Sequence, residues 1–255
     1  MKAAILTLLT AGAAGAQTML DQEQRLIEIH SLLIELQPMG PPGALAPGET
    51  SLGVEVIGIP TIDGTTGSKT QITASDRTRV FPRPRASIGL PAPDGYRAWA
   101  GLAYIPPIAI RDVSSHFIGA DAGMAWAPQS PLTAGLRVHA LYAESKSPVT
   151  DPNTRDVLDT FEYGADVSAA WRFDLGRLSL TPFAAVGVTR VQGDFTVTSD
   201  AAKLQSYTTN PGITGGVTLL AGPGIQAMAE LVIFPGRMVH PSFSIAWVHD
   251  WFTRR

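Results

Sequence analysis

Apolar side chains recur at every second position from Ser51 onward, and this period constrains the fold more than any other feature. A clear example is the alternation in residues 161–173 of Phe161, Tyr163, Ala165, Val167, Ala169, Trp171 and Phe173. Residues 132–143 repeat it with Leu132, Ala134, Leu136, Val138, Ala140 and Tyr142. A period of two places alternate side chains on opposite faces of a β-strand. The sequence therefore predicts an all-β fold whose strands have one apolar face and one mixed polar face.

About ten such strands are expected, and the connections between them decide the architecture. The strands are predicted at 52–59, 85–90, 96–104, 117–126, 132–143, 161–173, 178–190, 213–221, 225–234 and 242–251. The connections 60–84, 105–116, 144–160, 191–212 and 235–241 are long, whereas 91–95, 127–131, 174–177 and 222–224 are short and turn-like. Long and short connections alternate throughout. An even number of strands with long loops at one rim and short turns at the other is typical of an up-and-down membrane barrel.

Composition supports a barrel in lipid over a soluble β-sandwich. Only 16% of the 255 residues are charged, and a sandwich would place a charged face in water. The formal charge of -3 gives no basic face for nucleic acid. The absence of cysteine excludes disulfides, thiolate catalysis and zinc–cysteine sites.

The segment from about Ser51 to Trp251 resembles the Gram-negative outer-membrane β-barrels, in the porin-like and OmpA-like sense. The resemblance rests on "LTAGLRVHALYA", "FEYGADVSAAWRF" and the closing "FSIAWVHDWF". The last of these looks like the C-terminal signal read by the barrel-insertion machinery, although Thr253, Arg254 and Arg255 follow it. The resemblance implies a transmembrane antiparallel barrel of about ten strands (eight to twelve) in the outer membrane, with lipid and that machinery as partners.

The N-terminal region is predicted to contain three parts. Residues 1–16 have the positive start, apolar run and small-residue cleavage pattern of a signal peptide, with cleavage expected after Ala16. Residues 17–50 contain an amphipathic helix at 21–37, followed by a Pro/Gly-rich linker at 38–48. Residues 51–255 form the barrel. No later apolar run is long enough for a transmembrane helix, and both termini are expected in the periplasm.

The amphipathic period of the helix leaves its role open. Leu26, Ile29, Leu33 and Leu36 recur on one side, with Gln24, Glu28, Ser31 and Glu35 on the other. Three roles fit this pattern. The helix could cap the barrel, plug its lumen, or dock a periplasmic partner through residues 21–37.

If the apolar faces point to lipid, the opposite positions of the strands line the lumen. The predicted lumen-lining charged residues are Glu55, Arg85, Arg97, Asp121, Arg137, His139, Glu162, Asp166, Arg172, Glu230 and Asp250. Such charges must pair or stay hydrated, so they form either a salt-bridged core that holds the barrel shut or a path for a small solute. About ten strands lies just above the number whose side chains fill the interior, which argues against a wide pore.

The sequence gives little support for catalysis or metal binding. No histidine pair has the spacing of a helical metal site, and Asp151, Asn153, Asp156 and Asp159 lack the EF-hand pattern, so no metal or cofactor is expected. We expect a structural or partner-binding barrel, or a narrow small-molecule conduit, and not an enzyme. The alternative is a lipid-modifying or proteolytic barrel enzyme, for which the adjacent Ser114, Ser115 and His116 at the outer rim are the candidates.

Overall fold

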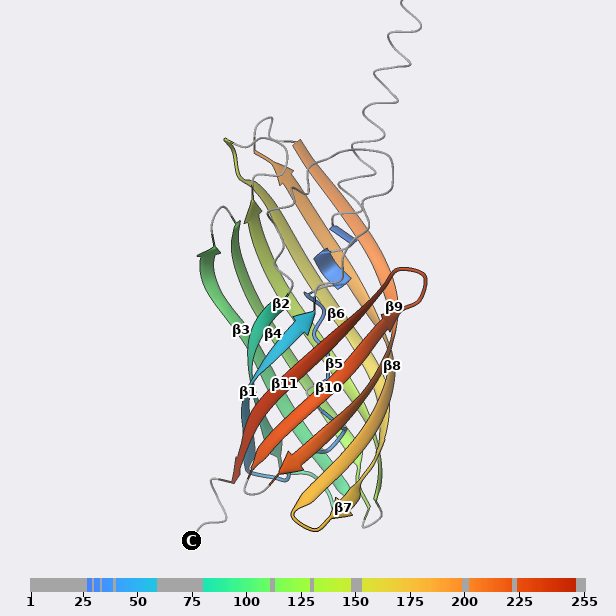
Figure 1. The fold of residues 1–255 in the computed structure, drawn as a ribbon. Helices are drawn as coiled ribbons and strands as arrows, with labels where there is room; N and C mark the ends of the chain where they lie inside the picture. The colour runs from blue at the N-terminus through green and yellow to red at the C-terminus, as the bar shows by residue number, and fades with distance from the viewer. Residues whose placement is uncertain are drawn as a thin grey trace, which may run out of the picture.

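The protein is a closed antiparallel β-barrel in a computed structural model that describes residues 27–28, 30–32, 34–38, 40–58, 80–110, 113–128, 131–147, 153–198, 202–221 and 224–250 (Figure 1). The strands are β1 (Glu49–Gly58), β2 (Val80–Leu90), β3 (Tyr96–Ile110), β4 (Val113–Trp126), β5 (Leu132–Ser147), β6 (Asp156–Trp171), β7 (Phe173–Leu175), β8 (Leu178–Val197), β9 (Ala202–Ala221), β10 (Ile225–Phe234) and β11 (Met238–Asp250). Neighbours in sequence pair except β6 and β7, β1 pairs with β11, and pairing of β6 with β8 completes the ring.

The wall has ten strand positions, as predicted, because β7 continues β6. Only Arg172 separates the two strands, and both pair with β8. The pairing closes around the ring, and unpaired strand edges occur toward the loop side, where β2 before Arg85 and β9 before Ile213 lack one neighbour. A closed ring is what a sheet needs in order to stand in lipid.

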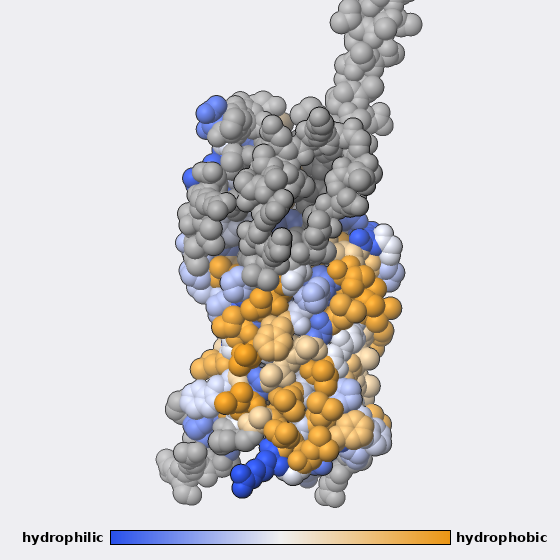
Figure 2. Space-filling model, viewed as in Figure 1, coloured by the Kyte–Doolittle hydropathy of each residue, from blue (hydrophilic) through white to orange (hydrophobic). Residues whose placement is uncertain are grey.

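The side chains that point outward form an apolar band. The most exposed large ones in the middle of the wall include Leu52, Leu102, Leu136, Val138, Val167, Val186 and Ile245. Tyr96 and Trp126 face each other on neighbouring strands near the short turns, while Tyr104, Tyr142 and Tyr163 lie nearer the other rim. Figure 2 shows this apolar surface across the lower and middle part of the visible face. Apolar side chains bordered by aromatic ones are typical of a wall in contact with lipid.

All five connections predicted as long loops are shorter in the structure, and two of them illustrate the difference. Residues 235–241 contain a turn of only three residues between β10 and β11. The predicted loop 191–212 is mostly strand, because β8 runs to Val197 and β9 begins at Ala202. The reason for the second difference is packing, since Val191, Phe195 and Val197 face inward and are buried.

The N-terminal segment runs along the inside of the barrel, and we call residues 27–48 the plug. Ile27 packs against Leu158 and Phe195 at the loop-side end of the wall. At the other end, the Gly43 carbonyl accepts a hydrogen bond from Arg97, close to the short turns. The plug therefore passes through the lumen from the loop side to the turn side, where β1 begins (Figure 1).

The helix within the plug is shorter than predicted at its C-terminal end. Helical residues are found at 27–28, 30–32 and 34, and residues 35–38 have no regular structure. The predicted end at Gln37 is therefore wrong. The cause is that wall arginines take the carbonyl oxygens of Ile34, Glu35 and Gln37 as acceptors. The predicted signal peptide and residues 21–26 of the predicted helix lie outside the described part of the chain. Among the described residues, no helix is long and apolar enough to span a membrane.

We predict that Val167→Arg destabilises the barrel far more than Leu175→Arg. Val167 is 53% exposed and lies midway along β6 between Tyr163 and Trp171, whereas Leu175 is 61% exposed in β7 at the turn end. A charge at the centre of the apolar band costs about 2 to 4 kcal/mol, and the cost falls to between about 0 and 1 near the rims. Denaturant unfolding in lipid vesicles measures both values. Equal losses for the two variants would contradict a wall that faces lipid.

Candidate functional site

The plug is held to the wall by two buried arginines of β2. Arg83 donates through Nη1 to the carbonyl oxygens of Ile34 and Glu35, at 2.8 and 3.1 Å. Arg85 donates through Nη1 to the carbonyl oxygen of Gln37, at 2.6 Å. These oxygens follow the helical residues, where carbonyl groups lack partners within the helix. The wall thus satisfies the end of the plug helix with charged donors.

The same arginines belong to a ring of ion pairs at the middle of the lumen. Arg83 pairs with Glu55 at 2.8 Å, and Arg85 bridges Glu55 and Asp121 at 3.3 and 3.1 Å. We call the buried charged residues at this level the charge belt: Glu55, Arg83, Arg85, Asp121, Arg137, Glu162, Asp166 and Glu230. Each arginine of the belt faces at least one carboxylate, so the positive charge is matched within the wall.

A second part of the belt reaches the plug through a hydroxyl group. Arg137 pairs with Asp166 at 2.7 Å. His139 lies 3.1 Å from the Thr189 hydroxyl, and Thr189 donates to the carboxylate of Glu35 on the plug at 2.7 Å. A cavity of about 20 Å³ lies between this side of the plug and the wall, enough for about one water molecule. The plug and the wall are therefore closely packed at this level.

Acidic groups outnumber basic groups in the belt. Five carboxylates, those of Glu55, Asp121, Glu162, Asp166 and Glu230, face the three guanidinium groups of Arg83, Arg85 and Arg137. Glu162 is fully buried, and neither of its carboxylate oxygens has a hydrogen bond within the described residues. Ser242 donates to Glu230 at 2.8 Å. The belt consequently offers no positive charge that lacks a matching acid.

Of the eleven predicted lumen residues, eight are buried inside the barrel, two are half-buried and one is exposed. Glu55, Arg85, Asp121, Arg137, His139, Glu162, Asp166 and Glu230 are at most 8% exposed, while Arg97 and Asp250 are half-buried near the turn side. Arg172 is a correction to the prediction. It lies at the break between β6 and β7, is exposed, and pairs with Asp174 on the surface at 2.7 Å. Its side chain was predicted to point into the lumen, and this is wrong because the strand is interrupted at Arg172.

Three charged residues that hold the plug were missed from the sequence. Arg83 falls in a segment predicted as loop, because Pro82 and Pro84 flank it. β2 pairs with β3 only from Arg85 onward, so these prolines lie where no partner needs their missing N–H groups. Arg83 lies two positions before Arg85, and this spacing of two is the signal that could have identified Arg83 as a strand residue facing the lumen.

The other two missed residues lie on the plug and in a turn. Glu35 was predicted on the polar side of the helix, opposite the apolar side that was expected to pack, and in the structure it is buried. Arg237, in the turn after β10, pairs with Glu28 at 2.6 Å and donates to the side-chain oxygen of Asn210. No pattern in the sequence links Arg237 to the plug, because the contact joins distant segments.

Above the charge belt, toward the loop side, the inner wall carries buried apolar clusters, with polar side chains such as Thr160, Asn210 and His240 between them. Three buried clusters line this region and pack against the plug. They are Ile105, Phe117 and Leu141 around Ile34 and Leu36, then Leu158 and Phe195 around Ile27, then Val232 and Phe234 around Leu32. We call this part of the lumen the upper chamber. Apolar clusters are unusual in a barrel type whose interior is normally polar.

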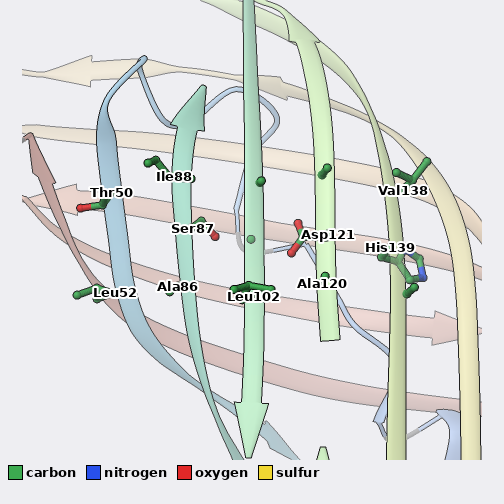
Figure 3. Close-up of a pocket in the computed structure, with 14 residues that line it drawn as sticks. Thr50, Leu52, Ala86, Ser87, Ile88, Leu102, Ala120, Asp121, Val138 and His139 are labelled. Carbon is green, nitrogen blue, oxygen red and sulfur yellow. The ribbon is translucent and has the colours of Figure 1, made fainter. Parts of the chain in front are cut away.

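A hollow of about 730 Å³ lies on the outer surface of the wall (Figure 3). Its outward-facing lining includes Leu52 on β1 and Val138 on β5 at the two sides, Leu102 on the central strand β3, and Ala86, Ala100, Ala120 and Ala122. Small side chains on adjacent strands create the depression. The hollow faces the lipid side and is separated from the charge belt by the backbone of β1 to β5.

Within the described part of the chain, His116 does not pair with Ser114 or Ser115. The ring of His116 packs edge-on against Tyr104 and Tyr142, away from Ser115. A different pair does approach, because His30 Nε2 lies 3.1 Å from the Ser145 hydroxyl. The other ring nitrogen of His30 faces the Thr160 hydroxyl at 3.4 Å instead of a carboxylate. Among the residues that the structure describes, no group of three or more acidic or histidine side chains is placed to hold a metal ion.

Comparison with known proteins finds similarity in architecture alone. No protein-family model matches the sequence, and no curated protein matches it. Solved structures that are similar include the translocator domain of the autotransporter NalP from Neisseria meningitidis, at 8% identity and TM-score 0.47, covering 95% of this chain and 99% of that one. The toluene transporter TodX from Pseudomonas putida is 11% identical with a TM-score of 0.37, and the match covers 84% of this chain and 71% of that one. LpxR from Salmonella typhimurium is 13% identical with a TM-score of 0.34, and the match covers 77% of this chain and 99% of that one.

The class follows from the geometry described above. A closed ring of ten antiparallel strand positions, an apolar exterior bordered by aromatic side chains, and charged groups turned inward together define an outer-membrane β-barrel. The chain has this fold.

We predict that Arg137→Ala lowers the free energy of unfolding by about 3 to 5 kcal/mol, because Asp166 is left buried without its partner. Arg172→Ala is the matched control, since it removes the exposed pair with Asp174 and should cost less than about 1 kcal/mol. Adding Asp166→Ala to Arg137→Ala should recover part of the loss. Denaturant titration in lipid vesicles tests this, and equal losses for the two arginine variants would show that the Arg137 pair is not dry.

Proposed function

We propose that the protein is a narrow small-molecule conduit of the outer membrane that its own plug keeps closed. The observation that carries this proposal is the set of hydrogen bonds from Arg83 and Arg85 to main-chain oxygens of the plug. These contacts join the wall to a separate segment that enters the barrel before β1. The wall completes its own hydrogen-bonded ring without the plug, so release of the plug leaves the barrel closed on itself and its lumen open.

The dimensions of the barrel favour this proposal over a permanently open pore or a solid structural barrel. About eight strands enclose an interior that side chains alone fill, and porins with open channels have about 16 to 18. Ten strand positions leave room for one additional chain segment, which the plug occupies. A structural barrel would need no separate segment, whereas a conduit needs one element that moves.

The proposal includes no catalytic step. The Ser145 and His30 side chains approach each other, but Thr160 faces the second ring nitrogen of His30. A triad requires a carboxylate there to orient the imidazole and to stabilise its charge. A hydrolytic function is therefore the weaker candidate for this barrel.

We further propose that the loop side faces the cell exterior and that the last strand ends toward the periplasm. β11 ends at Asp250 among the short turns, which lie on the periplasmic side in this class. Ile27 lies at the opposite, loop-side end of the wall. We therefore place Ile27, the first residue that the structure describes, near the outer opening, whereas the sequence predicted a periplasmic N-terminus.

Epitope tags test this orientation. A tag inserted near Gly67, between β1 and β2, and a tag after Gln17 should both bind antibody on intact cells. A tag after Arg255 is the control and should bind only after the outer membrane is permeabilised. Labelling of the Gln17 tag only after permeabilisation would contradict the direction in which the plug enters.

Conductance in planar bilayers tests the plug itself. The unmodified protein should show little or no stable conductance. Gly193→Leu should produce frequent openings, because a side chain at Gly193 would collide with Ile27 of the plug. Gly215→Leu is the matched control, since Gly215 is exposed and nothing lies within 4 Å of an added Cβ there.

A disulfide between the plug and the wall gives a second test, which holds even if Gly193→Leu does not fold. We call this disulfide the lock. The Ile27 Cβ lies 3.4 Å from the position that a Cβ would take on Gly193, close to the separation in a disulfide. The chain has no cysteine of its own. Ile27→Cys with Gly193→Cys should therefore be silent when oxidised, and should open more often when reduced. A large, steady conductance from the oxidised lock would refute the plug as the closing element.

A further inference from the structure

The upper chamber is lined by aromatic and aliphatic side chains that only the plug keeps from water. Phe117, Phe195 and Phe234 are each 1% exposed and point inward. The plug covers them with Ile27, Leu32, Ile34 and Leu36, all of them buried. Water in the vacated chamber would meet a large apolar surface, which is unfavourable. An apolar molecule is the kind of occupant that replaces these plug side chains without that cost.

The lower end of the chamber carries hydrogen-bond donors at a defined position. The guanidinium group of Arg83 stacks over the Phe117 ring, 5.3 Å from its centroid, so it lies at the boundary between the apolar wall and the charge belt. Arg83 and Arg85 direct three hydrogen bonds at carbonyl oxygens of the plug. In the closed barrel, these main-chain carbonyls take the place that an oxygen of a bound molecule could take.

The charge of the belt decides which oxygen-bearing group fits. Arg83 and Arg85 are already paired with Glu55 and Asp121, and two further carboxylates, those of Glu162 and Glu230, lie in the same belt. An added anion would find no unmatched positive charge to compensate it, because each arginine of the belt is already paired with a wall carboxylate. The donors instead suit a neutral acceptor, as they do in the contacts with the plug.

We infer that the upper chamber is a binding site for an apolar molecule with an uncharged carbonyl group, such as an ester or a ketone. The carbonyl lies at Arg83 and Arg85, and the apolar tail extends toward the loop side between Phe117, Phe195 and Phe234. The plug is then the intramolecular occupant that such a molecule must displace. This inference rests on the proposed function, and it names the class of molecule that the conduit accepts.

Photo-crosslinking in lipid nanodiscs tests the site. The probe is a methyl ester of dodecanoic acid with a diazirine at the tail end, applied to the double-cysteine protein in its reduced and oxidised forms. The reduced form should label peptides that contain Phe117, Phe195 or Phe234, and labelling should fall at least about fivefold in the oxidised form, because the lock retains the plug. Equal labelling in the two forms, or labelling confined to lipid-facing residues, would overturn the site.

Competition and a charge-conserving variant test the head group. Unlabelled methyl dodecanoate should compete better than dodecanoate or dodecyltrimethylammonium, and a stronger effect of either charged competitor would overturn the assignment of a neutral carbonyl. Arg83→Lys keeps the ion pair with Glu55 but loses the planar fork, so ester binding should weaken about tenfold. Arg172→Lys, at an exposed position that pairs only with Asp174 on the surface, is the matched control and should leave binding unchanged.

Conductance measured on the same samples separates this inference from the proposed function. If the lock suppresses openings but the ester labels no chamber peptide, the plugged conduit stands and the binding site is wrong. If the lock changes neither conductance nor labelling, both proposals are wrong.

Discussion

The structure depends on one constraint, which is that a wall one residue thick separates lipid from a narrow lumen. A polar side chain that points inward can find a partner only inside the ring, because the outer face offers only hydrocarbon. Arg83 and Arg85 show how this is solved. Each has a carboxylate on the wall and a main-chain oxygen on the plug, so two chain segments share the task of satisfying them. The plug is therefore part of the electrostatic structure of the barrel.

The same dependence runs from the plug back to the wall. β8 and β9 extend well past the apolar band, and their inner residues Val191, Phe195 and Val197 are buried. Phe195 and Val197 belong to the cluster that surrounds Ile27. Across the lumen, Arg237 in the loop-side turn between β10 and β11 pairs with Glu28 of the plug. The plug helix thus gives the loop-side half of the barrel an apolar core, which a hollow barrel would lack.

Periodicity in the sequence predicted the wall well because each strand has one face in lipid and one in the lumen. The alternation of Tyr163, Val167 and Trp171 with Glu162 and Asp166 already contains that division, and both acids are buried in the structure. Local pattern failed where the chain departs from an unbroken strand. The break at Arg172 turned its side chain to the surface, and the prolines around Arg83 concealed a strand that lacks a partner on one side.

The candidate site was harder to predict because it is formed by contacts between distant segments. The amphipathic period of the helix was visible, but one apolar side implied a partner on that side only. The barrel encloses the helix completely, so Ser31 and Glu35 on its polar side are buried as well. Nothing local to residues 34–37 indicates that their carbonyl oxygens meet Arg83 and Arg85. Those contacts follow from the ring closure, which brings residues nearly fifty positions apart to the same level of the lumen.

The central claim is that residues 27–48 lie inside the lumen, and the accessibility of a single cysteine at Gln37 tests it most directly. Gln37 is 3% exposed at the level of the charge belt, and the chain contains no other thiol. In folded protein reconstituted in vesicles, Gln37→Cys should resist a bulky membrane-impermeant maleimide and react fully after unfolding, whereas Gly95→Cys in an exposed turn should react at once. Rapid labelling of Gln37→Cys in the folded barrel, at a rate equal to that of Gly95→Cys, would contradict the account.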